Sequence, residues 1–390
     1  MRSMARSPAL PLSSPGASYP TRQRTDSPQQ EPSEGPGNFS RPFRVCALRC
    51  YIHRSPGLAR HYRKCIRAQA AKSESLELVL DLKGKLLESP VWDGRLQKLI
   101  FVDTDGQRIY KYDPSTPDSL ISVHLPEPVG FVGLTEVPDQ VLAGMERRVV
   151  LVDLQKQAII SDVAITPEEH GADGHRFNDG KPGPAGVCIF GRKHESSETP
   201  DGQRGRVYRL DMGPSVIRGK LTEVMTPEET QLPNGMGWDM QKGVMYLNDT
   251  FMKEFEDTPG IIWEIQVDKQ GVPARNASKQ LKKRVVYKIN VAKEGGPDGM
   301  TLDSQGRIWL ALAKGSKLIC VDPTSNTEVH RINMPIQMPT ACAFGGKNLD
   351  ELYITSTELG GGKGAGGLWR YTLEGLKGLS AAHVATIQSS

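Results

Sequence analysis

Residues 295–312 read GGPDGMTLDSQGRIWLAL. The glycines and the proline at its start predict a tight turn that carries Asp298, and the residues after it predict two short strands separated by a turn at Gly306. The second strand, ending at Leu312, is rich in apolar residues that fit a buried sheet. A carboxylate held at a turn by two rigid strands suits a functional site better than a core.

The same plan recurs along the chain. One recurring unit is a strand that ends in Asp, and it is found at Arg108–Asp113, Arg148–Asp153, Arg206–Asp211, Trp263–Asp268 and Lys317–Asp322, with Leu368–Leu373 as a sixth copy that lacks the acid. An apolar strand precedes each copy, at Leu99–Asp103, Val141–Met145, Gly186–Phe190, Val244–Asn248, Ile308–Leu312 and Glu351–Thr355. A turn rich in Gly, Pro, Asp or Asn lies before each of these strands.

Six such units, roughly 40 to 60 residues apart, match the period of propeller blades. Because a lone antiparallel blade cannot bury both of its faces, blades stack radially around a channel. The sequence therefore predicts an all-β fold, a six-bladed β-propeller with four-stranded blades, in which Leu76–Leu80 closes the ring against the last blade. A β-sandwich is the structural alternative. The longer segments His194–Arg206, Lys253–Gly260, Asp268–Lys282 and Gly360–Gly367 are predicted to be loops on one face.

The composition of the 390-residue chain changes near residue 72. Residues 1–72 are rich in Arg, Ser and Pro and poor in aliphatic residues, which predicts a disordered N-terminal extension. Because such an extension also has the composition of a transit peptide, a cytoplasmic and an organellar location are both expected possibilities. Residues 73–390 are predicted to form the propeller.

The charge distribution limits the kind of partner. The net charge is +4, but about a dozen Arg and Lys residues lie in the first 70 positions, so the remaining chain is mildly acidic. A mildly acidic domain argues against a nucleic-acid partner. No apolar run approaches the ~18 residues of a membrane span, so no membrane association is expected. No obligate protein partner is indicated either.

The six cysteines predict no disulfide framework. Cys188, Cys320 and Cys342 lie in or beside apolar strands and are expected to be small core residues. Cys46, Cys50, His53, His61 and Cys65 could surround a zinc ion, but their spacing matches no closed zinc module well.

Four predicted turns at the heads of the channel-lining strands carry polar residues: Glu88, Asn178 with Asp179, Asn234, and Asp298. Together, Glu88, Asn234 and Asp298 offer two carboxylates and one amide oxygen. Such an all-oxygen set suits Ca²⁺, Mg²⁺ or Mn²⁺ and, less typically, Zn²⁺. The alternative is that Asp and Asn simply favour turns. Glu88 does not fit that alternative, because Glu is not a favoured turn residue.

Several of these stretches, in this order, resemble the regucalcin (senescence marker protein)/gluconolactonase family: ESPVWD, RFNDGK, NGMGWD, PDGMTLDSQGRIWLA and TACAFGGKNLDELYIT. The resemblance covers residues 80 to 371. It implies a six-bladed propeller, one divalent metal ion in the channel and hydrolysis of a small-molecule sugar lactone. The implied metal ligands are Glu88, Asn234 and Asp298.

The resemblance also implies that Arg176 and Asn178 orient the substrate. A further acid that binds sugar in this family falls at Glu195 or Ser196, where the local text departs from the family. Asp249 matches an Asp that the family keeps near the metal, although it could equally serve a strand-end turn. In the expected mechanism, the metal acts as a Lewis acid and Asp298 acts as the general base.

Two other functions remain open at this point. One is a non-catalytic, calcium-binding regulatory propeller, which would bind metal without converting a lactone. The other is a relative of strictosidine synthase, but the metal-binding set of Glu, Asn and Asp argues against it. The sequence contains no GxSxG element, so serine-esterase chemistry has no support.

Overall fold

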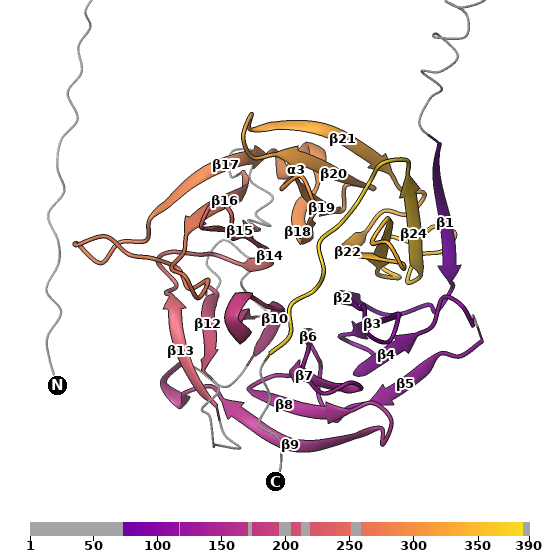
Figure 1. Ribbon diagram of the computed structural model, residues 1–390, viewed down its shortest axis with the longest axis horizontal. Helices are drawn as coiled ribbons and strands as arrows, with labels where there is room; N and C mark the ends of the chain where they lie inside the picture. The colour runs from indigo at the N-terminus through magenta and orange to yellow at the C-terminus, as the bar shows by residue number, and fades with distance from the viewer. Residues whose placement is uncertain are drawn as a thin grey trace, which may run out of the picture. The chain divides into compact units, whose positions relative to one another are not determined.

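The structure of the protein is a computed structural model that describes residues 73–116, 118–170, 174–194, 204–211, 219–250 and 259–384. The predicted N-terminal extension, with its possible zinc ligands, lies outside the described residues. The described strands form six four-stranded antiparallel sheets arranged around a centre (Figure 1). The predicted six-bladed propeller is therefore confirmed, and the β-sandwich alternative is wrong.

Each blade is a meander of four strands. The innermost strands are β2 (Leu87–Asp93), β6 (Phe131–Leu134), β10 (His175–Pro182), β14 (Pro233–Asp239), β18 (Gly296–Leu302) and β22 (Pro339–Gly345). The second strands are β3 (Lys98–Asp103), β7 (Gln140–Gly144), β11 (Cys188–His194), β15 (Val244–Asp249), β19 (Ile308–Ala313) and β23 (Glu351–Ser356). The third strands are β4 (Arg108–Tyr112), β8 (Arg148–Asp153), β12 (Arg206–Asp211), β16 (Gly260–Gln266), β20 (Lys317–Asp322) and β24 (Leu368–Leu373). The outermost strands are β5 (Ile121–His124), β9 (Ala158–Ile165), β13 (Lys220–Met225), β17 (Lys283–Ile289), β21 (Thr327–Asn333) and β1 (Glu74–Leu80).

The first strand of the propeller closes the ring, as predicted. β1 pairs in antiparallel fashion with β24, so the sixth blade contains strands from both ends of the described chain. Leu76 and Leu78 of β1 pack against the apolar cluster of that blade. The pairing of β1 with β24 thus closes the ring between the first and last blades.

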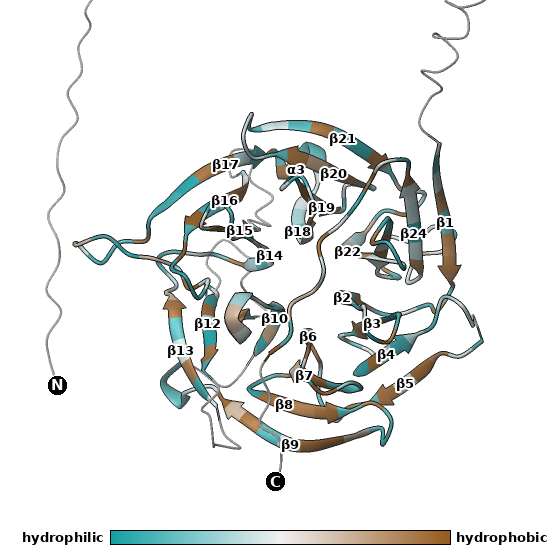
Figure 2. Ribbon diagram, viewed as in Figure 1, coloured by the Kyte–Doolittle hydropathy of each residue, from teal (hydrophilic) through white to brown (hydrophobic). Residues whose placement is uncertain are grey.

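Apolar side chains fill the spaces between blades, and Figure 2 shows hydrophobic stretches in the strands all around the ring. In the blade of β18, for example, β19 is buried along its whole length. Such continuous burial is expected where a sheet packs on both faces. Cys188, Cys320 and Cys342 are all buried and free, as predicted.

The predicted placement of the long loops on one face is only partly right. The inner strands start at one end of the channel, so the connections from second to third strands return to that end. The segment 360–367 is a connection of this kind, and most of 194–206 and 253–260 lies outside the described residues. The segment 268–282 instead joins a third strand to a fourth, and therefore lies at the opposite end. No described helix is long and apolar enough to span a membrane.

A candidate metal centre at one mouth of the channel

Five of the six inner strands share one irregularity near their starts. In β2, β10, β14, β18 and β22 the pairing with the second strand skips, so that three steps on the inner strand oppose two on its neighbour. This is the signature of a β-bulge, which redirects a side chain. The skipped intervals are Glu88/Val91, Phe177/Gly180, Pro233/Met236, Pro297/Met300 and Pro339/Cys342.

The bulges correct the expected local structure of the candidate ligands. Glu88, Asn234 and Asp298 do not lie in turns ahead of the inner strands. They lie inside β2, β14 and β18, at or beside the bulge. The glycines and prolines that predicted turns instead allow the bulge. Because the strands are rigid, the bulge fixes these side chains more firmly than a loop would.

Glycines beside these residues allow neighbouring inner strands to approach closely. A Cβ added to Gly235 would lie 2.4 Å from the backbone nitrogen of Met300 and 2.6 Å from the carbonyl oxygen of Asp298. A Cβ added to Gly299 would lie 2.3 Å from that of Ala341. Only glycine fits where two backbones come this close.

Glu88 is the most unusual residue at this mouth. It is partly buried, and its carboxylate makes no hydrogen bond or ion pair with any described residue. Burial raises its pKa well above the ordinary value, and the negative charges of Asp298 and Asp179 raise the pKa further. Arg176 and Lys193 act in the opposite direction without compensating. Among the described residues, no cation or donor contacts the Glu88 carboxylate directly, although buried charges usually require such a partner.

The side-chain oxygen of Asn234 is also left without a donor. The amide Nδ2 of Asn234 donates to Thr250 Oγ1 at 3.4 Å, and that hydroxyl donates in turn to the carbonyl oxygen of Pro297. This chain of donors turns the amide so that Oδ1 has no hydrogen-bond partner among the described residues. An amide oxygen with a fixed orientation is a suitable ligand for a hard cation.

The backbone of Asp298 is held in place by β15. Asn248 Nδ2 donates a 2.5 Å hydrogen bond to the carbonyl oxygen of Asp298. The neighbouring residue Asp249 has a different function. Its Oδ1 accepts hydrogen bonds from the backbone nitrogens of Gln231 and Leu232, both at 2.9 Å. Asp249 therefore fastens the segment that leads into β14, through contacts 17 and 18 positions away in the sequence and not through a local turn.

Blade one repeats the Asp249 anchor. Asp103 Oδ1 accepts from the nitrogen of Leu86 at 2.9 Å, and Asp103 Oδ2 accepts from that of Lys85 at 3.1 Å. Leu86 and Lys85 lead into β2 as Leu232 and Gln231 lead into β14. The second strand of each of these blades thus holds the entry to the strand that carries a candidate ligand.

Two of the three predicted substrate-binding residues, Arg176 and Asn178, lie in β10 and are held by hydrogen bonds. Arg176 donates to the carbonyl oxygen of Phe177 at 2.9 Å and to Asn178 Oδ1 at 3.3 Å. Asn178 Nδ2 donates to the carbonyl oxygen of Pro233 at 3.0 Å, which ties β10 to β14. Asn178 thus serves as a link between blades as well as a candidate contact. Glu195 lies outside the described residues.

Sequence reasoning gave no role to two residues that follow Asn178. Asp179 is 8% exposed, accepts one hydrogen bond from its neighbour Gly180, and lies close enough to influence Glu88. Lys181, two residues further along β10, donates to the carbonyl oxygen of Met300 at 2.9 Å. The charges of Asp179 and Lys181 are close enough to shift each other's pKa. The sequence Asn-Asp-Gly-Lys at 178–181 sets these two opposite charges two positions apart, and this spacing could have drawn attention to them.

Among the described residues, no three His, Cys, Asp or Glu side chains come together in a way that could hold a metal ion. The candidate set contains only two carboxylates, and its third member is an amide. These oxygen ligands fit a hard divalent cation whose remaining coordination positions are filled by water. They are the carboxylate of Glu88 and the side-chain oxygen of Asn234, neither of which has a hydrogen-bond partner among the described residues, and the nearby carboxylate of Asp298.

Comparison with known proteins places these features in a family. The family model described as SMP-30/gluconolactonase/LRE-like region matches residues 86–358, which is more than half of the chain. The chain belongs to this family. The matched region includes every inner strand and all three candidate metal ligands. It ends before β24 and the C-terminal segment, and it does not include β1.

Individual relatives extend over most of the chain. It is 30% identical over 290 residues to regucalcin of Danio rerio, covering 74% of this chain and 88% of the relative. It is 27% identical over 317 residues to regucalcin of Xenopus laevis, covering 79% and 97%. A solved luciferin-regenerating enzyme, 25% identical, superposes with a TM-score of 0.67 over 80% of this chain and 100% of that one. A regucalcin from Agrobacterium tumefaciens, 18% identical, superposes with a TM-score of 0.66 over 80% and 97% and shows the fold.

Proposed function

We propose that this protein hydrolyses sugar lactones with one divalent metal ion held by Glu88, Asn234 and Asp298. The observation that carries the proposal is the Glu88 carboxylate, which has no hydrogen-bond or ion-pair partner among the described residues and lies near two further acids. Removing that much charge from water is costly unless a cation compensates for it. The family relationship supplies the reaction class, since gluconolactonases are among the proteins for which the family is named.

A divalent ion at this site would polarise the lactone carbonyl and lower the pKa of an attacking water. The side chains of the protein transfer the proton and orient the substrate. Asp298 accepts the proton of the water as its oxygen attacks the carbonyl carbon. When the ring C–O bond breaks, the same proton passes to the departing ring oxygen, and the product is the open hydroxy acid. Arg176 and Asn178 orient the sugar hydroxyls, and the Arg176 charge offsets the developing oxyanion.

The first experiment measures lactone hydrolysis with a pH indicator. The protein is stripped with a chelator and resupplied separately with Ca²⁺, Mg²⁺, Mn²⁺ or Zn²⁺, and gluconolactone and galactonolactone are compared. We expect turnover that depends on metal and that is lost in Glu88→Gln. Glu374→Gln is the matched control, because Glu374 is exposed and remote from the inner strands. Equal activity in the chelated and resupplied protein would contradict the proposal.

The general-base assignment needs its own variant. Asp298→Asn keeps the size of the side chain and an oxygen for the metal but removes the proton acceptor. We expect kcat to fall by several orders of magnitude while the melting temperature changes little. If Asp298→Asn retained near wild-type activity, Asp298 would not be the base.

A second candidate is a non-catalytic metal-binding propeller. The solved Agrobacterium relative is described as a calcium-binding protein, and the all-oxygen ligand set suits Ca²⁺. Turnover distinguishes the two candidates. Calorimetric Ca²⁺ binding that is lost in Glu88→Gln, together with no hydrolysis of any lactone, would favour the binding function over the enzyme.

A further inference from the structure

The C-terminal segment, residues 374–384, crosses the centre of the ring (Figure 1). It is attached at both sides of the opening. The backbone nitrogen of Gly378 donates to the carbonyl oxygen of Leu349 at 2.7 Å on one side, and that of Val384 donates to Leu134 at 2.9 Å on the other. Between these points, no backbone hydrogen bond holds residues 379–383 to the described blades. The segment thus forms a strap fixed at its two ends.

A pocket of about 240 Å³ lies between this strap and the channel wall. Its walls include Trp92, Trp238, Leu302 and Phe344 from four inner strands and Ser380 from the strap. These wall residues lie near the ends of the inner strands, whereas the candidate metal ligands lie near their starts. Trp238 lies four positions after Asn234 in β14, which at ~3.3 Å per residue is about 13 Å. The aromatic end of the pocket is therefore remote from the candidate metal centre, whereas its inner end, at Pro90, lies two positions along β2 from Glu88.

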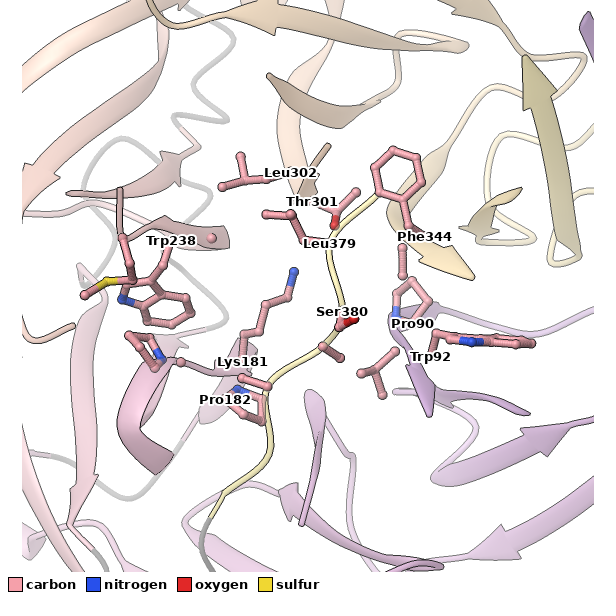
Figure 3. Close-up of a pocket in the computed structure, with 18 residues that line it drawn as sticks. Pro90, Trp92, Lys181, Pro182, Trp238, Thr301, Leu302, Phe344, Leu379 and Ser380 are labelled. Atoms are coloured by element: carbon pink, nitrogen blue, oxygen red, sulfur yellow. The ribbon is translucent and has the colours of Figure 1, made fainter. Parts of the chain in front are cut away.

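Lys181 gives the pocket its charge. Figure 3 shows its side chain extending into the pocket between Trp238 and the strap. Its ammonium group makes one hydrogen bond, to the carbonyl oxygen of Met300 at 2.9 Å, and no ion pair with any described residue. An ammonium group has three protons to donate, so two remain for a ligand. Burial lowers the pKa of Lys181, and the negative charge of Asp179, two positions earlier in β10, acts in the opposite direction.

The rest of the wall is apolar and aromatic. Trp238 has its indole N–H satisfied by the carbonyl oxygen of Gly271 at 2.8 Å, so it presents only its ring. The indole N–H of Trp92 is buried and has no hydrogen-bond partner among the described residues. Ser380 and the two alanines after it are small, so the middle of the strap leaves the space unfilled. Flat apolar walls with a single cation suit a ligand with a ring at one end and an acid at the other.

We propose that this pocket binds a small aromatic carboxylate, with the carboxylate at Lys181 and the ring between the strap and the aromatic wall. The volume lies just below the ~300–1,000 Å³ of drug-sized sites, so the ligand is correspondingly small. Hydrogen bonds to charged groups contribute more to binding than neutral ones do. The carboxylate therefore sets the selectivity, and the ring supplies the buried apolar area.

The test uses 3-phenylpropionate as the probe and 3-phenylpropan-1-ol as its uncharged analogue, with binding measured by isothermal titration calorimetry. Chelator is present throughout, so the result does not depend on the candidate metal centre or on lactone hydrolysis. We expect the acid to bind roughly tenfold or more tightly than the alcohol. In Lys181→Met, which keeps the length of the side chain, the two affinities should become equal. Equal affinities in the wild-type protein, or no binding of the acid, would overturn the proposal.

A second variant tests the place of binding without touching Lys181. Ser380→Phe puts a large side chain into the pocket from the strap and should abolish binding of the acid. Lys377→Phe is the matched control, since Lys377 is an exposed residue of the same strap that does not line the pocket. Both variants should melt close to the wild-type temperature. Wild-type affinity in Ser380→Phe would show that the acid binds elsewhere.

Discussion

Gly235 lies against Asp298 so closely that a Cβ on Gly235 would be 2.6 Å from the carbonyl oxygen of Asp298. These two residues belong to the bulges of adjacent blades, and both bulges carry a candidate metal ligand. The close approach of the two backbones sets how far the Asn234 oxygen lies from the Asp298 carboxylate. The geometry of the site therefore depends on a residue that has no side chain.

Gly235→Ala should weaken metal binding. The new methyl group meets backbone atoms, which cannot move aside as a flexible side chain can, so β14 and β18 must separate. We expect metal affinity to fall about tenfold or more, since site geometry controls affinity for a hard cation. Calorimetric titration with Ca²⁺ measures the change. Gly94→Ala is the control, because nothing lies within 4 Å of a Cβ at Gly94. Unchanged affinity in Gly235→Ala would show that the spacing of the blades does not set the site.

Glu88→Gln should stabilise the metal-free protein at neutral pH. Because folding raises the Glu88 pKa above its ordinary value of 4.5, the folded state binds this proton more tightly than the unfolded state does. The metal-free wild type therefore loses stability as the pH rises above that value, and Gln removes the loss. Melting temperatures measured in chelator should show a benefit of Glu88→Gln that grows from pH 4 to pH 8.

Added metal should reverse the order of the two proteins. A ligand at 100 times its dissociation constant stabilises the folded state by about 2.7 kcal/mol. Wild-type protein should gain a few degrees in melting temperature from Ca²⁺, and Glu88→Gln should gain none. A benefit of Glu88→Gln that was the same at every pH would indicate that the Glu88 charge is compensated in the metal-free protein.

Much of the fold could be predicted from the sequence. The strands ending in Asp at Asp153, Asp211 and Asp322 recur at a blade-like period, and Leu76–Leu80 supplies the predicted closing strand. These features are local patterns of alternation and turn residues, which a single sequence shows directly. Glu88 could be singled out because Glu is an unusual turn residue.

Other features depend on contacts that local sequence does not reveal. The Pro-Asn-Gly and Pro-Asp-Gly stretches suggest turns, yet Asn234 and Asp298 lie within strands, because pairing with the next strand imposes a bulge. The link from Lys181 to Met300 joins residues 119 positions apart. The strap could not be predicted because its path depends on two distant attachment points, at Leu349 and Leu134.

Asp249→Ala should destabilise the fold. Without the carboxylate, the backbone N–H groups of Gln231 and Leu232 lose their acceptor in a buried environment, and each orphaned donor costs about 1–3 kcal/mol. We expect the free energy of unfolding to fall by about 2–5 kcal/mol, measured by urea denaturation. Asp322→Ala is the control, since Asp322 caps an exposed turn through Thr324. A loss no larger than that of the control would mean that Asp249 is not a structural anchor.

Removing β1 should open the ring. A chain beginning at Lys83 lacks the strand that pairs with β24 and the two leucines that pack on the sixth blade, Leu76 and Leu78. It also leaves β24 as an open edge, which favours association between molecules. We expect a melting temperature lower by many degrees and oligomers on size-exclusion chromatography, whereas a chain beginning at Ser73 should behave like the full chain.

Two point variants in β1 separate the loss of apolar packing from the loss of an ion pair. Leu78→Asp should reproduce much of the loss, while Glu77→Gln, which removes only an exposed ion pair with Arg370, should cost about 0–1 kcal/mol. If the chain beginning at Lys83 melted with the full chain, closure by β1 would contribute little to stability, and the contacts between β2 and β22 would have to hold the ring together.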